Sequence, residues 1–116
     1  MIKKPDQFEK KLFQDFHGGR GEVEAYALFS EEEKTNPKIR MASKVVLQPG
    51  CSIGPHPHEK DEEIIYILEG VATVNDDGAE ILAYPGDAAI CGGGKNHGVA
   101  NNGREPLVYL AFIITK

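Results

Sequence analysis

The sequence contains little cysteine and no long apolar run, and both absences limit what the protein can be. Cys51 and Cys91 are its two cysteines, too few for the disulfide framework of a small secreted domain, so we expect free thiols. No apolar segment approaches the roughly 20 residues that cross a bilayer, and the N-terminus lacks a signal-peptide pattern. We therefore expect a cytoplasmic protein without a membrane-spanning segment.

Basic residues are outnumbered by acidic ones. The chain has 13 Lys and Arg against 18 Asp and Glu, which gives a formal net charge of −5. Nucleic acids and anionic membranes are bound by clustered basic surfaces, so this balance argues against both as partners. With 116 residues, the chain has the length of one domain and can bury a real core.

Histidine is scarce too, but three of the four lie in two glycine-punctuated stretches. His56 and His58 are two residues apart, so on a β-strand both side chains leave the same face. Residues 59–61 provide a turn, after which Glu63 on the next strand returns over the histidines. Two imidazoles and one carboxylate suit a divalent transition ion, and His97 from the second stretch would add a third imidazole. An octahedral ion would then keep two positions open.

Short apolar or alternating segments, separated by turn residues, make up most of the chain. The sequence predicts strands at 22–29, 39–47, 63–68, 71–75, 79–84, 88–91 and 106–114. This pattern is typical of a small all-β barrel or sandwich.

Before these strands, residues 1–17 are compatible with a short amphipathic helical turn or an irregular arm that packs on the barrel or on a second subunit. His17 has no partner at ligand spacing, so we expect a surface histidine there. We divide the chain into an N-terminal arm, 1–21, and a single β-barrel domain, 22–116.

The first histidine stretch resembles a motif of the cupin family. That motif is a glycine, five residues, His-x-His, three or four residues, a glutamate, six residues and a glycine. Gly50, His56, His58, Glu63 and Gly70 meet every spacing. Glu62 competes with Glu63 as the carboxylate ligand, but the six-residue interval to the closing glycine favours Glu63.

The second stretch resembles the other cupin motif. Gly86, Gly94, His97 and Asn101 fit its spacing, while Gly92 stands where a proline is usual, which loosens a turn without changing a ligand. The resemblance implies a double-stranded β-helix, or jelly-roll barrel, and a homodimer.

The resemblance also implies that one divalent metal, Mn, Fe, Ni, Co or Zn, is bound inside the barrel by His56, His58, Glu63 and His97. A metal-free barrel that keeps these residues from a metal-binding ancestor is the alternative.

The family resemblance implies a metalloenzyme acting on a small acid or sugar by dioxygenase, decarboxylase, isomerase or lyase chemistry. The alternative is a non-catalytic protein that binds or senses a small ligand and whose metal is structural. The sequence identifies no catalytic acid or base. The available groups are Tyr26, Lys44, Cys51, Tyr84, Cys91 and Tyr109.

Overall fold

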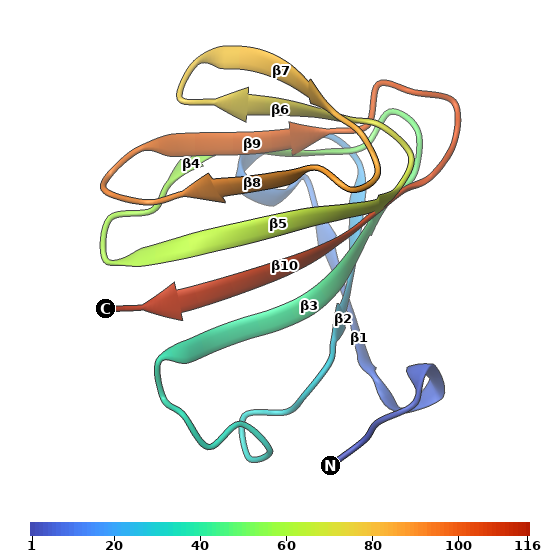
Figure 1. Ribbon diagram of the computed structural model, residues 1–116. Coiled ribbons are helices and arrows are strands. Elements are labelled where there is room, and N and C mark those ends of the chain that lie inside the picture. Colours follow the sequence, from blue (N-terminus) through green and yellow to red (C-terminus); the bar gives the residue numbers. More distant parts are fainter.

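The chain forms two antiparallel sheets that face each other, as the computed structural model of residues 1–116 shows (Figure 1). The six-stranded sheet has the order β1 (Glu9–Gln14), β2 (Glu22–Ala27), β3 (Ile39–Leu47), β10 (Leu107–Thr115), β5 (Asp61–Glu69) and β8 (Ala88–Cys91). The four-stranded sheet has the order β4 (Ser52–Pro57), β9 (Asn96–Ala100), β6 (Ala72–Asp76) and β7 (Ala79–Ala83). This is the all-β jelly-roll barrel that the sequence predicts.

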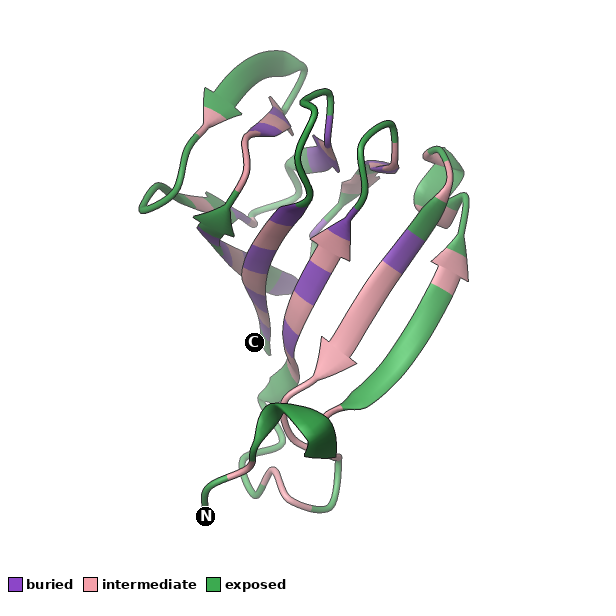
Figure 2. Cartoon of the chain, turned by 90° about the vertical axis from the view of Figure 1, so that its right-hand side faces the viewer, coloured by how far each residue is buried: buried purple, intermediate pink, exposed green.

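Strict alternation along the central strands produces the core between the sheets. Buried and more exposed residues alternate along β5 and β10, which is visible as banding along the strands in Figure 2. Ile65 and Ile67 point into the core, whereas Tyr66 between them is 43% exposed. The expected inward and outward faces of this strand are therefore confirmed.

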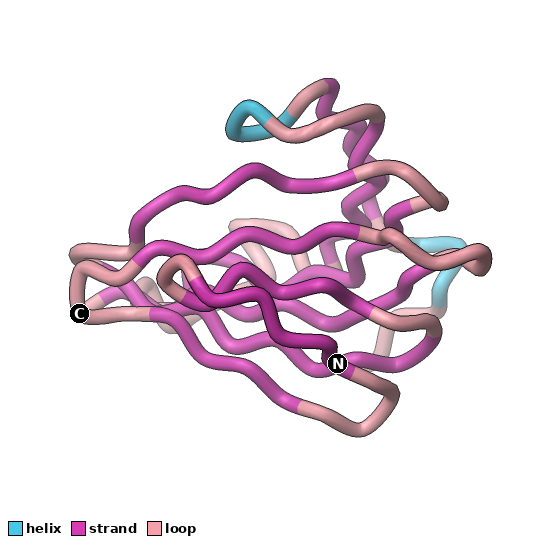
Figure 3. Tube along the Cα trace, turned by 90° about the horizontal axis from the view of Figure 1, so that it is seen from above, coloured by secondary structure: helices cyan, strands magenta, loops and turns pink.

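The N-terminal segment is more ordered than an irregular arm. It contains two 3-10 turns, η1 (Pro5–Gln7) and η2 (Phe16–Gly18), and between them β1 pairs with β2 along its whole length. The residues of β1 are mostly exposed. Its sequence lacks the apolar alternation from which a strand is predicted. Almost all of the remaining trace is strand or loop (Figure 3), and neither helical turn has the length or apolar character to cross a membrane.

A buried amide holds one end of the barrel together. Asn101 is fully buried, and its Nδ2 donates to the carbonyl oxygens of Leu47 and Glu105, both at 2.8 Å. Its Oδ1 accepts from the Gly103 N–H at 3.0 Å. The asparagine of the second motif is therefore a structural residue that joins β3 to the loop before β10.

The turn η2 lies against β4 at a contact that only glycine permits. The Ser52 N–H donates to the Arg20 carbonyl oxygen at 2.7 Å, and the Arg20 N–H donates to Ser52 Oγ at 2.9 Å. A Cβ on Gly54 would lie 2.1 Å from the His17 carbonyl oxygen, and one on Gly19 would lie 2.2 Å from that of Ser52. This contact fixes η2 over the end of β4 that carries His56.

Replacing Gly54 with alanine is expected to destabilise the protein by about 1–3 kcal/mol, because backbone has to move to admit the methyl group. Gly103→Ala is the matched control, since its Cβ would meet its nearest neighbour at an ordinary 3.4 Å. The denaturant midpoints of both variants measure the difference. Equal midpoints for the two variants would show that the contact between η2 and β4 yields easily.

Candidate metal centre

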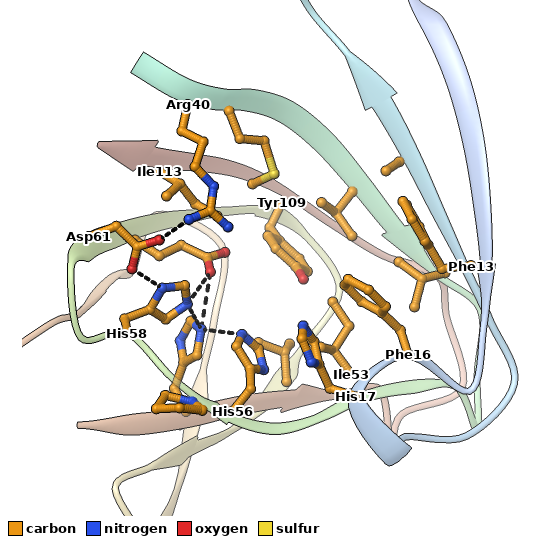
Figure 4. Close-up of a pocket in the computed structure, with 18 of the residues that line it drawn as sticks. Phe13, Phe16, His17, Arg40, Ile53, His56, His58, Asp61, Tyr109 and Ile113 are labelled. Carbon is orange, nitrogen blue, oxygen red and sulfur yellow. Dashed lines mark hydrogen bonds and ion pairs between the residues drawn. The ribbon is translucent and has the colours of Figure 1, made fainter. Parts of the chain in front are cut away.

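Four predicted ligands from separate parts of the chain meet between the sheets (Figure 4). His56 lies on β4, His58 follows that strand directly, Glu63 lies on β5 and His97 on β9. One ligand atom from each residue lies within 4.8 Å of the others. Three of the four side chains are buried and His56 is half-buried, so the cluster could hold an ion away from bulk water.

Strand register explains why these residues converge. His56 pairs directly with His97 across the β4–β9 ladder, after an irregularity that begins at Ile53. On β5, Glu63 is 7% exposed and faces the cluster, whereas its neighbour Glu62 is exposed. The structure thus brings Glu63, and not Glu62, to the three histidines.

The cluster contains more short contacts than hydrogen bonds can account for. His97 Nε2 lies 3.1 Å from His58 Nε2, 3.2 Å from His56 Nε2 and 3.1 Å from Glu63 Oε1. An imidazole nitrogen carries at most one proton, so His97 Nε2 cannot make three hydrogen bonds at once. A shared cation would satisfy all of these contacts together.

Hydrogen bonds at Nδ1 of His56 and His58 leave the Nε2 atoms, which face the cluster, with lone pairs. His58 Nδ1 lies 2.7 Å from Asp61 Oδ1, and His56 Nδ1 lies 2.8 Å from the Gly54 carbonyl oxygen. Both oxygens accept, so each Nδ1 donates, and a neutral ring then has a free lone pair on Nε2. This is the tautomer that a metal ligand needs, and the donor set therefore fits a transition ion.

Asp61 belongs to the site although the sequence indicates only a turn there. It is 7% exposed and lies between His58 and Arg40, whose Nη1 donates to Asp61 Oδ2 at 2.5 Å. Arg40 therefore neutralises the carboxylate that orients His58. The signal in the sequence is the position of Asp61 three residues after a ligand histidine, but its arginine partner is 21 residues away.

His17 is exposed, as the sequence predicts, yet it lies against the site. Its ring stacks on that of His56 with centroids 4.0 Å apart, and Phe16 lies 4.2 Å from it on the other side. The rings of Phe16 and His56 shield part of the His17 ring from water, which lowers its pKa, and the neighbouring His58 adds to this effect. Burial also lowers the pKa of His56, with the Gly54 hydrogen bond opposing the shift. Both effects favour neutral rings.

A pocket of about 620 Å³ opens beside the four ligands. Of the six groups that the sequence offers as acid or base, only Tyr109 lines it. Tyr109 is 1% exposed, and burial, with a smaller effect of Glu63, raises its pKa well above the usual value. Tyr84 is half-exposed elsewhere, and Lys44 lies over the Tyr26 ring at 4.9 Å. Both cysteines are free and lie outside the pocket wall.

Comparison with known proteins identifies the family. The sequence model of the cupin domain family matches residues 43–113 of this chain. This chain belongs to the cupin family. Of curated proteins, the oxalate-binding protein of Thermotoga maritima is 35% identical over 114 residues, covering 98% of this cupin and 93% of the relative.

Solved structures agree with this assignment. A predicted oxalate decarboxylase from Thermotoga maritima superposes with a TM-score of 0.93 at 34% identity, with 100% of both chains covered. The polyketide cyclase RemF from Streptomyces resistomycificus has a TM-score of 0.81 at 20% identity, covering 100% of this cupin and 81% of that chain. The second likeness shows the fold alone.

Replacing Asp61 with asparagine is expected to weaken metal binding roughly 10–100-fold, because the neutral amide supports the His58 tautomer and basicity less well. Competition with a chromogenic chelator measures the affinity for Zn²⁺ or Mn²⁺. Glu62→Gln is the matched control, since it removes a neighbouring exposed carboxylate. If both variants bind the ion like the parent protein, Asp61 does not support the ligand.

Proposed function

We propose that this cupin binds one divalent transition metal through His56, His58, Glu63 and His97, and binds a small organic acid at that metal. The observation that carries the proposal is the convergence of four ligand atoms within 4.8 Å of one another. In addition, the Nδ1 atoms of His56 and His58 are hydrogen-bonded on the side away from the cluster. Mn, Fe, Ni, Co and Zn all accept this donor set. When bound, the ion supplies a Lewis acid that attracts and polarises an oxygen of the ligand.

An acid is the favoured ligand because of the charge beside the cluster. Arg40 lines the pocket and uses one terminal nitrogen for Asp61, so its other donors are available to a carboxylate. Two relatives, an oxalate-binding protein and a predicted oxalate decarboxylase, support the same class of ligand. Sugar-type ligands, which the family resemblance also implies, lack the negative charge that Arg40 would bind.

Turnover of the bound acid is the second part of the proposal. Tyr109 places a proton-bearing hydroxyl on the pocket wall, where it is able to donate to a reacting oxygen. Decarboxylase, dioxygenase, isomerase and lyase chemistry are the reaction types to assay. Binding without turnover would leave the protein as a metal-dependent acid-binding or sensing cupin.

We also propose a cytoplasmic homodimer. The free thiols Cys51 and Cys91 suit a reducing compartment. On the edge strands β7 and β8, Leu82 is 55% and Ile90 60% exposed, which favours cover by a second copy. Analytical ultracentrifugation should give the mass of a dimer, and Leu82→Lys with Ile90→Lys should give a monomer. A monomeric parent protein would refute this arrangement.

Elemental analysis of the protein purified without a His tag is expected to find one equivalent of Fe, Mn, Ni, Co or Zn, and much less in His97→Ala. Calorimetry should then detect oxalate binding by the metal-loaded protein and none after chelation, because the acid binds through the ion. His17→Ala is the matched control, because it removes a histidine beside the site that is not among the four ligands. This variant should contain as much metal as the parent protein.

If the purified protein takes up no added divalent ion, the proposal is refuted and the alternative of a metal-free barrel remains. Equal oxalate binding before and after chelation would keep an acid-binding pocket but remove the metal from its function. Product analysis by mass spectrometry on the same samples separates an enzyme from a binding protein.

A further inference from the structure

The pocket beside the ligands has two halves of different chemistry. At one end lie the metal ligands, Arg40 and Tyr109, which offer coordination and hydrogen bonding. Glu59 and Lys60 also line the pocket, but most of the remaining wall is apolar and includes Phe13, Phe16, Val45, Ile53 and Val99. Oxalate consists of two joined carboxylates and offers nothing to such a wall. At about 620 Å³ the pocket also has the size of sites that hold larger organic ligands.

Aromatic rings line the apolar half in a fixed order. Phe13 on β1 stacks on Phe16 with centroids 4.6 Å apart, Phe16 lies 4.2 Å from His17, and His17 stacks on the ligand His56 at 4.0 Å. This row of rings leads from the pocket wall to the metal centre (Figure 4). Because the glycine contact at Gly54 locks η2 onto β4, the row is held in place before any ligand binds.

Two unused donors at the polar end face the same space. The Tyr109 hydroxyl is directed into the pocket (Figure 4) and makes no hydrogen bond to the rest of the chain. Figure 4 shows Arg40 with one terminal nitrogen at Asp61 and the other over the pocket. A carboxylate near the ion would therefore find donors on two sides.

We propose that the acid bound by this cupin carries an aromatic group next to its carboxylate, as in aryl-substituted 2-hydroxy or 2-oxo acids. This inference rests on the proposed function, in which the ion holds the acid. The four ligand residues would hold the ion to which the carboxylate binds, and Arg40 and Tyr109 would donate to the oxygens of the acid. The aromatic group lies in the apolar half beside Phe13 and Phe16 and removes their exposed faces from water.

Mandelate and lactate give a direct test, since they differ only in a phenyl group in place of a methyl. Calorimetry on the metal-loaded protein is expected to show mandelate binding at least about tenfold tighter than lactate and tighter than oxalate. Phe16→Ala should reduce the preference for mandelate over lactate severalfold, because it removes the ring that the phenyl group contacts. Phe8→Ala, a truncation in the same segment outside the pocket wall, should preserve the preference.

The comparison of acids in the parent protein remains decisive if Phe16→Ala does not fold. Lactate or oxalate binding as tightly as mandelate would overturn the aromatic ligand and leave metal-dependent acid binding intact. An unchanged preference in a folded Phe16→Ala variant would also overturn it, because the ring would then lie elsewhere. If metal-loaded protein binds none of the three acids, the proposed function itself fails and this inference fails with it.

Discussion

Electrostatic repulsion among lone pairs is the constraint around which this barrel is arranged. Three imidazole nitrogens and a carboxylate oxygen share a space in which no two ligand atoms are more than 4.8 Å apart. Without a cation, these atoms have too few protons to hydrogen-bond one another. The fold therefore has to supply stability elsewhere, and it does so through the β4–β9 ladder, the Asp61 and Gly54 contacts behind the rings, and a core of alternating aliphatic residues.

A chain of contacts supports the centre and runs inward from the protein surface. Arg40, whose side chain is mostly exposed, pairs with buried Asp61, which orients buried His58. A buried carboxylate without a counter-charge would be costly, so Arg40 makes Asp61 tolerable and Asp61 makes the histidine a good ligand. A surface arginine thereby acts on the candidate ligand His58 through Asp61, without touching it.

Local patterns in the sequence predict the ligands and most strands, but not the contacts between distant segments. The spacing of His56, His58 and Glu63 predicts that these side chains converge, and they do, because two strands joined by one short turn fix their geometry. Residues 9–14 lack apolar alternation, so only pairing with β2 makes them a strand. The stacking of His17 on His56 depends on a backbone approach between Gly19 and Gly54, which no local pattern records.

The candidate metal ligands and part of the pocket wall come from different parts of this chain. All four ligands lie within residues 43–113, the part that matches the cupin domain. Arg40, Phe13, Phe16 and His17 lie before it and contribute to the pocket wall. These N-terminal residues reach the pocket through β1, the η2 contact and the start of β3, and two of them also support the centre, since Arg40 pairs with Asp61 and His17 stacks on His56. Under the proposed function, substitutions at Phe13 or Phe16 would change the apolar wall of the pocket while all four candidate ligands remain in place.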